Sequence, residues 1–168
     1  SSATQLQALA PGATWMAGHR FGAGASRSEV EQWINSLQED TDNGNNINYN
    51  KMNIRVNGRT LTATMTDNSS ARALIDLLKE GDIVIDMSDY GDFEKVGDLG
   101  HTLPQNNENI NTQAGDLILY QGRNFVIYYG NNSWSLTRLG KIDNISQAEL
   151  KELLGEGNVT VTLSAVRQ

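Results

Sequence analysis

Cysteine is absent from this chain of 168 residues, and histidine and proline occur only twice each. The lack of cysteine excludes disulfides, thiol nucleophiles and thiolate metal ligands. The histidines, His19 and His101, fall in different predicted units, and neither has a histidine or carboxylate at ligand spacing. The sequence therefore predicts no metal site. It also lacks any apolar run near the roughly 20 residues of a membrane span, so we expect no membrane insertion.

Basic residues are in the minority. The chain has 20 acidic and 13 basic residues and a formal net charge of −7. A negative surface repels phosphate backbones, so nucleic acid is not an expected partner. The acidic residues are scattered along the chain, which is typical of a solvated surface that aids solubility.

The clearest structural pattern lies between Gly115 and Ile142. Leu117–Tyr120 and Phe125–Tyr129 are runs of β-branched and aromatic residues, and Gly122 lies between them, which predicts a hairpin. Residues 133–139 alternate, with Trp134, Leu136 and Arg138 expected on one face. Three consecutive strands of this kind indicate a β-barrel or a sandwich.

The rest of residues 52–168 also fits a small β-rich domain. An opening hairpin is predicted over Met52–Met65, with Asn57-Gly58 as its turn. Two helices are expected, one from about residue 69 to Gly81 and one after the capping box Ser146–Glu149. Further strands are predicted at 82–87 and at 159–163.

Residues 88–104 mix aromatic, charged and glycine residues without a clear period. Loops that carry function have this composition, so we interpret the stretch as a functional loop. His101 within it is the one candidate general base, although an exposed loop histidine is the more ordinary interpretation. Residues 105–113 are expected to be a polar connection.

Residues 1–37 differ from the rest. A short strand is predicted at Ala13–Met16, and a capping box at Ser26–Glu29 opens a helix whose apolar stripe includes Trp33. Residues 38–51 are rich in Asn and Asp, so we expect a polar linker there.

Two segments, Leu9–Phe21 and Ser26–Ile34, resemble the last strand and last helix of a flavodoxin-like domain. The flavin phosphate loop of that family, which captures an anion with backbone amides at a helix start, is not found in this chain. We therefore expect no cofactor in this chain, and FMN only if a complete flavodoxin-like domain lies upstream.

Four segments, Met87–Gly97, Leu99–Pro104, Gly115–Gly122 and Tyr128–Ile142, resemble the bacterial cyclophilin-like family of small β-barrels. The resemblance implies a mainly β fold, a closed cyclophilin-like barrel with two helices, preceded by a strand-helix appendage. The expected organisation is a flavodoxin-like remnant at 1–37, a polar linker at 38–51 and the barrel at 52–168.

Three functions stay open. The leading hypothesis is a non-catalytic module that binds a small ligand or peptide and serves a flavodoxin-like flavoprotein. The alternatives are a peptidyl-prolyl isomerase, whose signature segments are not found, and a structural or docking domain. The candidate ligand-binding residues are Tyr90, Phe93, Glu94, His101, Tyr120, Trp134 and Arg138.

The expected partners are a flavodoxin-like domain or a small ligand, with a homodimer through the Trp33 helix as an alternative. The compartment stays open between the bacterial cytoplasm and export after removal of an upstream signal. Because the chain begins with Ser1 rather than Met, the sequence leaves open whether it is a fragment of a longer flavodoxin fusion.

Overall fold

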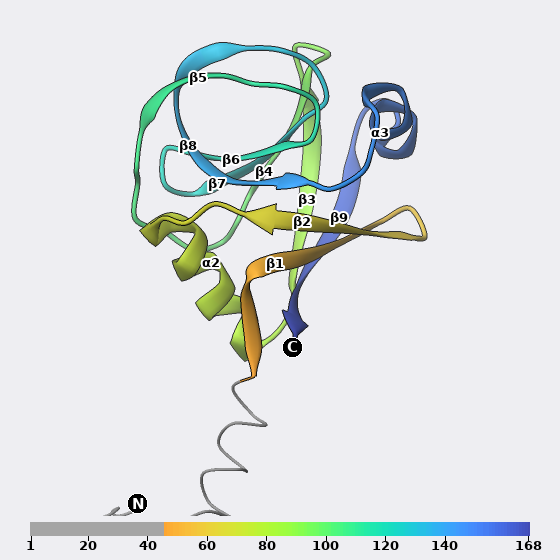
Figure 1. Ribbon diagram of the computed structural model, residues 1–168. Helices are drawn as coiled ribbons and strands as arrows, with labels where there is room; N and C mark the ends of the chain where they lie inside the picture. Colours follow the sequence, from red (N-terminus) through yellow and green to blue (C-terminus); the bar gives the residue numbers. More distant parts are fainter. Residues whose placement is uncertain (1–45) are drawn as a thin grey trace, which may run out of the picture. The chain divides into compact units, whose positions relative to one another are not determined.

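Eight antiparallel strands close a β-barrel in the order β2-β1-β9-β3-β4-β7-β6-β8, and β8 pairs back with β2 (Figure 1). The computed structural model describes residues 46–168. A short strand, β5, pairs with β8 and adds a ninth member to the sheet. The strands are β1 (Ile47–Val56), β2 (Arg59–Met65), β3 (Ile83–Tyr90), β4 (Glu94–Asp98), β5 (Glu108–Asn111), β6 (Asp116–Tyr120), β7 (Asn124–Tyr128), β8 (Ser133–Ile142) and β9 (Val159–Arg167). This is the closed mainly β barrel that the sequence predicts.

Two of the hairpins have the turns that the sequence predicts. Asn57 and Gly58 have φ values of 47° and 80°, and they connect β1 to β2 directly, because Val56 pairs with Arg59. Positive φ at both central residues matches the right-handed twist of the strands, and Asn-Gly adopts it at low cost. Gln121 and Gly122 repeat positive φ between β6 and β7.

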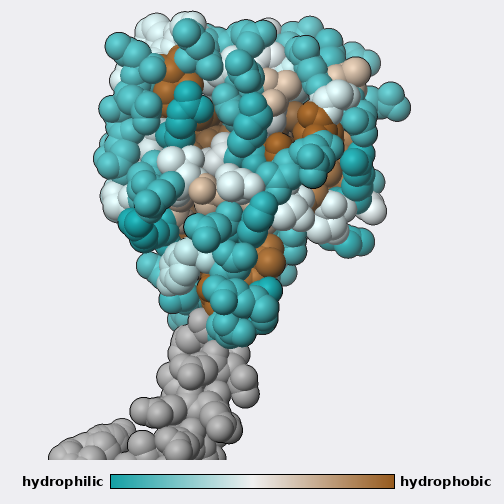
Figure 2. Space-filling model, viewed as in Figure 1, coloured by the Kyte–Doolittle hydropathy of each residue, from teal (hydrophilic) through white to brown (hydrophobic). Residues whose placement is uncertain are grey.

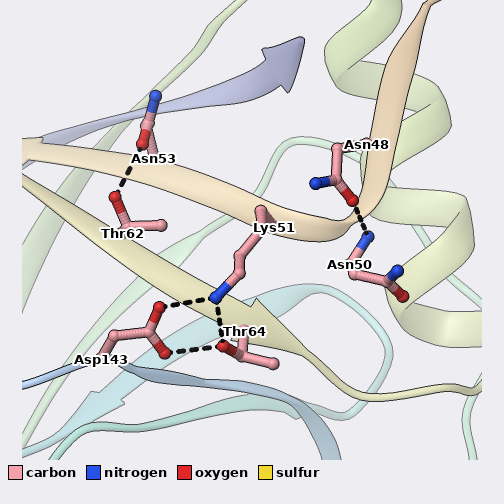
Figure 3. A network of polar contacts seen from close by, with 7 residues as sticks. All are labelled: Asn48, Asn50, Lys51, Asn53, Thr62, Thr64 and Asp143. Carbon is pink, nitrogen blue, oxygen red and sulfur yellow. Dashed lines mark hydrogen bonds and ion pairs between the residues drawn. The ribbon is translucent and has the colours of Figure 1, made fainter. Parts of the chain in front are cut away.

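The barrel closes between β2 and β8, and a polar network ties this seam together (Figure 3). The Lys51 ammonium donates to Thr64 Oγ1 at 2.8 Å and to Asp143 Oδ2 at 2.9 Å. Thr64 in turn donates to Asp143 Oδ1 at 2.6 Å. Because Asp143 directly follows β8, the three side chains join β1, β2 and the end of β8 across the seam.

Two helices, α2 (Ser69–Glu80) and α3 (Gln147–Leu154), lie on opposite sides of the barrel (Figure 1). The Asn68 side chain caps α2 by accepting from the Ala71 amide at 2.8 Å. Ser146 and Glu149 form the predicted capping box of α3. The apolar stripes of both helices join one core inside the barrel, through Ala71, Leu74, Ile75, Leu78, Leu150 and Leu154.

The structure corrects several predicted boundaries. β1 begins at Ile47 rather than Met52, so the expected linker 38–51 is wrong for residues 47–51. Ile47 is buried, and Ile47 and Asn48 pair with β9 before a register shift at Asn48/Met52. The Asn-rich composition of this stretch hides the strand. The predictions for residues 1–37 and 38–45 lie outside the described residues.

The stretch 88–104 is also more regular than expected. β3 runs on to Tyr90, and β4 occupies Glu94–Asp98, so the predicted loop is largely a strand, a tight turn and a second strand. Met87 shares the buried face of Ile85, although the sequence pattern does not place Met87 in strict alternation with Ile83 and Ile85. Within the predicted polar connection 105–113, Ile110 is buried and anchors β5.

Candidate functional site

A cavity of about 810 Å³ opens on the outer face of the barrel. Its floor is a second hydrophobic cluster, separate from the main core, which includes Ile118, Val126, Tyr128 and Leu136. The turn between β3 and β4 and the start of β8 supply the rest of its wall. The cavity is lined by Tyr90, Gly91, Phe93, Glu94, Val96, Tyr120, Val126, Tyr128, Asn132, Trp134 and Leu136.

Alternation along β4 decides which side chains enter the cavity. Glu94 and Val96 line it, opposite Tyr128 and Val126 of β7, while Lys95 between them points the other way. Lys95 is fully buried in the barrel interior. Its ammonium donates to the Gly157 carbonyl at 2.7 Å and pairs with the Asp89 carboxylate at 3.2 Å. Adjacent residues of β4 thus place an acidic and a basic side chain on opposite faces of the sheet.

A tight turn carries the aromatic wall. Gly91 and Asp92 have φ values of 64° and 61°, and the Phe93 amide donates to the Tyr90 carbonyl at 3.3 Å. The Phe93 carbonyl accepts from the amides of Tyr129 and Gly130, at 2.9 and 3.0 Å. A Cβ atom at Gly130 would lie 2.7 Å from Phe93 Cβ, so this position needs glycine for the two backbones to approach.

The rings of the wall are packed in a defined order. Phe93 stacks on Tyr128, with ring centroids 6.0 Å apart and planes inclined by 16°. Tyr90 meets Phe93 edge to face, at 5.9 Å and 85°. Both arrangements are favourable for ring quadrupoles. Tyr90 and Trp134 are each 63% exposed, so they form an open aromatic rim above a buried floor.

Glu94 is the acidic group of the lining, and its residue is only 8% exposed. Burial raises the pKa of Glu94, the hydrogen-bonding Tyr128 hydroxyl lowers it, and the charge of Asp89 raises it further. The net pKa lies above the ordinary value of a glutamate. Burial also raises the pKa of Tyr128 to about 12, while the Asn132 amide donates to its hydroxyl at 3.3 Å.

Five of the seven candidate residues line this cavity: Tyr90, Phe93, Glu94, Tyr120 and Trp134. His101 and Arg138 do not. His101 is exposed in the segment after β4. Arg138 lines a different, more polar cavity of about 380 Å³, where its guanidinium lies 3.9 Å from the buried Asp116 carboxylate. We leave these two residues out of the proposed site.

Sequence reasoning did not select the floor of the cavity. The remaining members of the lining are Gly91, Val96, Val126, Tyr128, Asn132 and Leu136. The sequence does indicate the part of the floor that β7 contributes, because Phe125–Tyr129 is apolar without interruption. A strand that is apolar on both faces is covered on both faces. The alternate residues Val126 and Tyr128 therefore belong to an outer cluster.

Within residues 46–168, no group of His, Asp and Glu side chains is arranged to hold a metal ion. In the same part of the chain, no helix is long and apolar enough to cross a membrane. The face seen in Figure 2 is mostly hydrophilic, with hydrophobic side chains in small separate patches. This face therefore offers no broad apolar surface.

Comparison with known structures agrees on the fold. The structure of McbB in complex with tryptophan matches with a TM-score of 0.51 and 15% identity, over 67% of this chain and 44% of that one. The solution structure of the hypothetical protein AF2241 from Archaeoglobus fulgidus matches with a TM-score of 0.51 and 15% identity, over 69% and 94%. This chain thus spans less than half of McbB.

No curated protein matches the sequence. The family model of the cyclophilin-like family, in contrast, matches residues 54–164. That range runs from the middle of β1 into β9 and includes every strand that lines the cavity. The chain belongs to the cyclophilin-like family.

Proposed function

We propose that this barrel is a non-catalytic binding module that takes a small ligand or a peptide side chain in the cavity on its outer face. The observation that carries the proposal is the aromatic wall, in which buried Tyr128 stacks on partly buried Phe93, beside the exposed rings of Tyr90 and Trp134. Exposed aromatic rings around a concave apolar floor are typical of a ligand site.

The dimensions and the support of the cavity favour this function. A volume of about 810 Å³ lies within the usual range of small-molecule sites. Its lining comes from five strands, the tight turn between β3 and β4, and Asn132 before β8, and backbone hydrogen bonds fix Phe93 to the end of β7. A site on rigid strands needs little ordering when a ligand binds, which preserves affinity.

Prolyl isomerisation has less support. The cyclophilin mechanism uses an arginine to polarise the prolyl amide. Among the described residues, those that line the cavity include no arginine, and Arg123 is paired with Asp98 at the β6–β7 hairpin, at 3.4 Å.

The expected role beside a flavodoxin-like flavoprotein depends on residues 9–34, and a docking role depends on the Trp33 helix. Both stay predictions.

The proposal is tested by titrating the full chain with a set of small aromatic and aliphatic fragments, followed by NMR of ¹⁵N-labelled protein. We expect saturable shifts at the Trp134 indole and at the amides of residues 90–96. Trp134→Ala should weaken these responses and leave the fold intact, because the side chain is mostly exposed.

Val84→Ala is the matched control, since Val84 is as exposed as Trp134 but does not line the cavity. It should leave every titration unchanged. The proposal would be overturned if fragments shift the NMR signals of residues elsewhere but never those of the cavity residues. Catalysed isomerisation of an Ala-Pro peptide by the full chain would replace it with the enzyme hypothesis.

A further inference from the structure

Within residues 46–168, the side chains that line the cavity include an acidic group but no basic one. Its lining has one carboxyl group, that of Glu94, and none of its members within the described residues is a lysine, arginine or histidine. The other side chains of the lining are five aromatic rings, three aliphatic residues and an amide. An ionised Glu94 therefore gives an otherwise apolar cavity a net negative charge.

Glu94 also lacks an internal counter-charge. Across residues 46–168, no basic side chain forms an ion pair with it. Its neighbour Lys95 is engaged inside the barrel by Asp89 and the Gly157 carbonyl. A buried carboxylate without a cation is costly, and proteins usually pair such a group. The missing cation can come from a ligand.

The rings around Glu94 suit a cation as well. The faces of Tyr and Trp rings carry negative potential and attract a positive charge within about 6 Å of the ring centre. Tyr128 lies directly opposite Glu94 across the β4–β7 pair, and Phe93 stacks on it. Trp134, which offers the strongest ring of this kind, is mostly exposed at the rim and free to cover an occupant.

We propose that the cavity binds a small organic cation whose methylated ammonium group lies between the aromatic rings and the Glu94 carboxylate. The inference rests on the proposed binding function and names its ligand class. A primary ammonium brings three N–H donors and needs as many acceptors. The lining offers few that are not already engaged, because the Tyr128 hydroxyl accepts from the Asn132 side-chain amide and the Tyr120 hydroxyl accepts from that of Gln121, each at 3.3 Å. A trimethylated, quaternary ammonium has no N–H, makes no such demand and is recognised by aromatic cages.

The test compares a cation with its uncharged isostere. Choline and 3,3-dimethylbutan-1-ol have the same shape, with nitrogen replaced by carbon, and benzyltrimethylammonium adds an apolar body that fills more of the cavity. Each is titrated into the full chain at pH 7.5 and followed at the Trp134 indole and the Glu94 amide. We expect choline to bind at least about tenfold more tightly than the alcohol, and benzyltrimethylammonium more tightly still.

Two variants and a control test which side chains cause the preference for choline over the alcohol. Glu94→Gln keeps the shape of the side chain and should reduce the affinity of choline toward that of the alcohol, with no effect on the alcohol itself; the rings retain a smaller part of the preference. Trp134→Leu keeps an apolar group but removes a ring face, so it should weaken the cation more than the alcohol. Glu152→Gln makes the same charge change on exposed α3 and should preserve the preference.

The outcomes separate the two proposals. If the alcohol binds as tightly as choline, or if Glu94→Gln leaves the preference for choline undiminished, the cation inference is wrong while the binding function stands. If neutral fragments occupy the cavity and no ammonium does, the same conclusion follows. If no compound shifts the NMR signals of the cavity residues, both proposals fail. A trimethyllysine peptide that binds more tightly than benzyltrimethylammonium would overturn the assignment to a small molecule.

Discussion

Replacement of Lys95 by methionine tests how the wall of the cavity is held in place. Lys95 is completely buried, and it connects β4 to Asp89 of β3 at 3.2 Å and to the Gly157 carbonyl at 2.7 Å. Asp89 also accepts from the Tyr129 hydroxyl and from the Asp92 amide. The network therefore fixes the inner side of the turn whose outer side carries Tyr90 and Phe93.

Breaking a buried ion pair by removing one partner costs about 3 to 5 kcal/mol. Methionine restores most of the apolar contacts of the lysine stem, and the Asp89 side chain keeps two donors and is 26% exposed. These features reduce the loss, so we expect Lys95→Met to lower the free energy of unfolding by about 2 to 3 kcal/mol. The urea midpoint, followed by circular dichroism, should fall by about 1 to 2 M.

The pH dependence provides an internal check. Burial raises the pKa of Asp89, but the hydrogen bonds from Tyr129 and Lys95 outweigh it and hold the net pKa below the ordinary 3.8. A carboxyl group with a lowered pKa stabilises the fold above its unfolded pKa, and this stability is lost as the pH falls through the folded value. The difference between wild type and Lys95→Met should therefore narrow below about pH 3.8.

Lys79→Met is the control, because it removes a lysine of α2 that pairs with Asp76 at the surface. Lys79→Met should lower the free energy of unfolding much less than Lys95→Met does. A loss below about 1 kcal/mol for Lys95→Met, or a loss that does not change with pH, would show that the buried pair does not stabilise the barrel.

Three further changes follow from single contacts. Glu94→Gln removes a carboxyl whose pKa burial raises above 4.5, so the variant should be more stable than wild type at pH 7 and not at pH 4, as urea unfolding would show. Gly130→Ala places a Cβ 2.7 Å from Phe93 Cβ, and we expect a loss of about 1 to 3 kcal/mol together with weaker ligand binding; unchanged stability would refute the close approach. Asn68→Ala removes the cap of α2 and a bond to the Arg138 carbonyl, at a cost of about 1 to 2 kcal/mol in thermal or urea unfolding, and Asn68→Ser should recover part of it.

The elements with local signals could be predicted from the sequence. Asn57-Gly58 determines its hairpin because both residues tolerate positive φ. Ser146 and Glu149 form a capping box because their side chains reach each other's backbone within one turn. In each case the stabilising contacts lie within a few residues, so the pattern and the structure carry the same information.

Boundaries set by distant contacts could not be predicted. β1 begins at Ile47 because it pairs with the end of β9, at Arg167. Glu94–Asp98 looks like a loop because its residues alternate between the cavity and the barrel interior, and neither face is uniformly apolar. Tyr128 was not selected for the site, although Tyr90, Phe93 and Trp134 were, because β7 is apolar on both faces and its pattern does not tell which residues face the barrel interior.

Glu94 and Lys95 show how the fold gives chemical meaning to two ordinary residues. On a helix or in a loop, adjacent opposite charges are usually solvated and neutralise each other. On β4 they point to opposite sides of the sheet, and both residues are largely buried. The inner charge finds Asp89 within the fold, whereas the outer charge faces aromatic rings and an open cavity. The same alternation that stabilises the barrel therefore leaves one negative charge for a cationic ligand to neutralise.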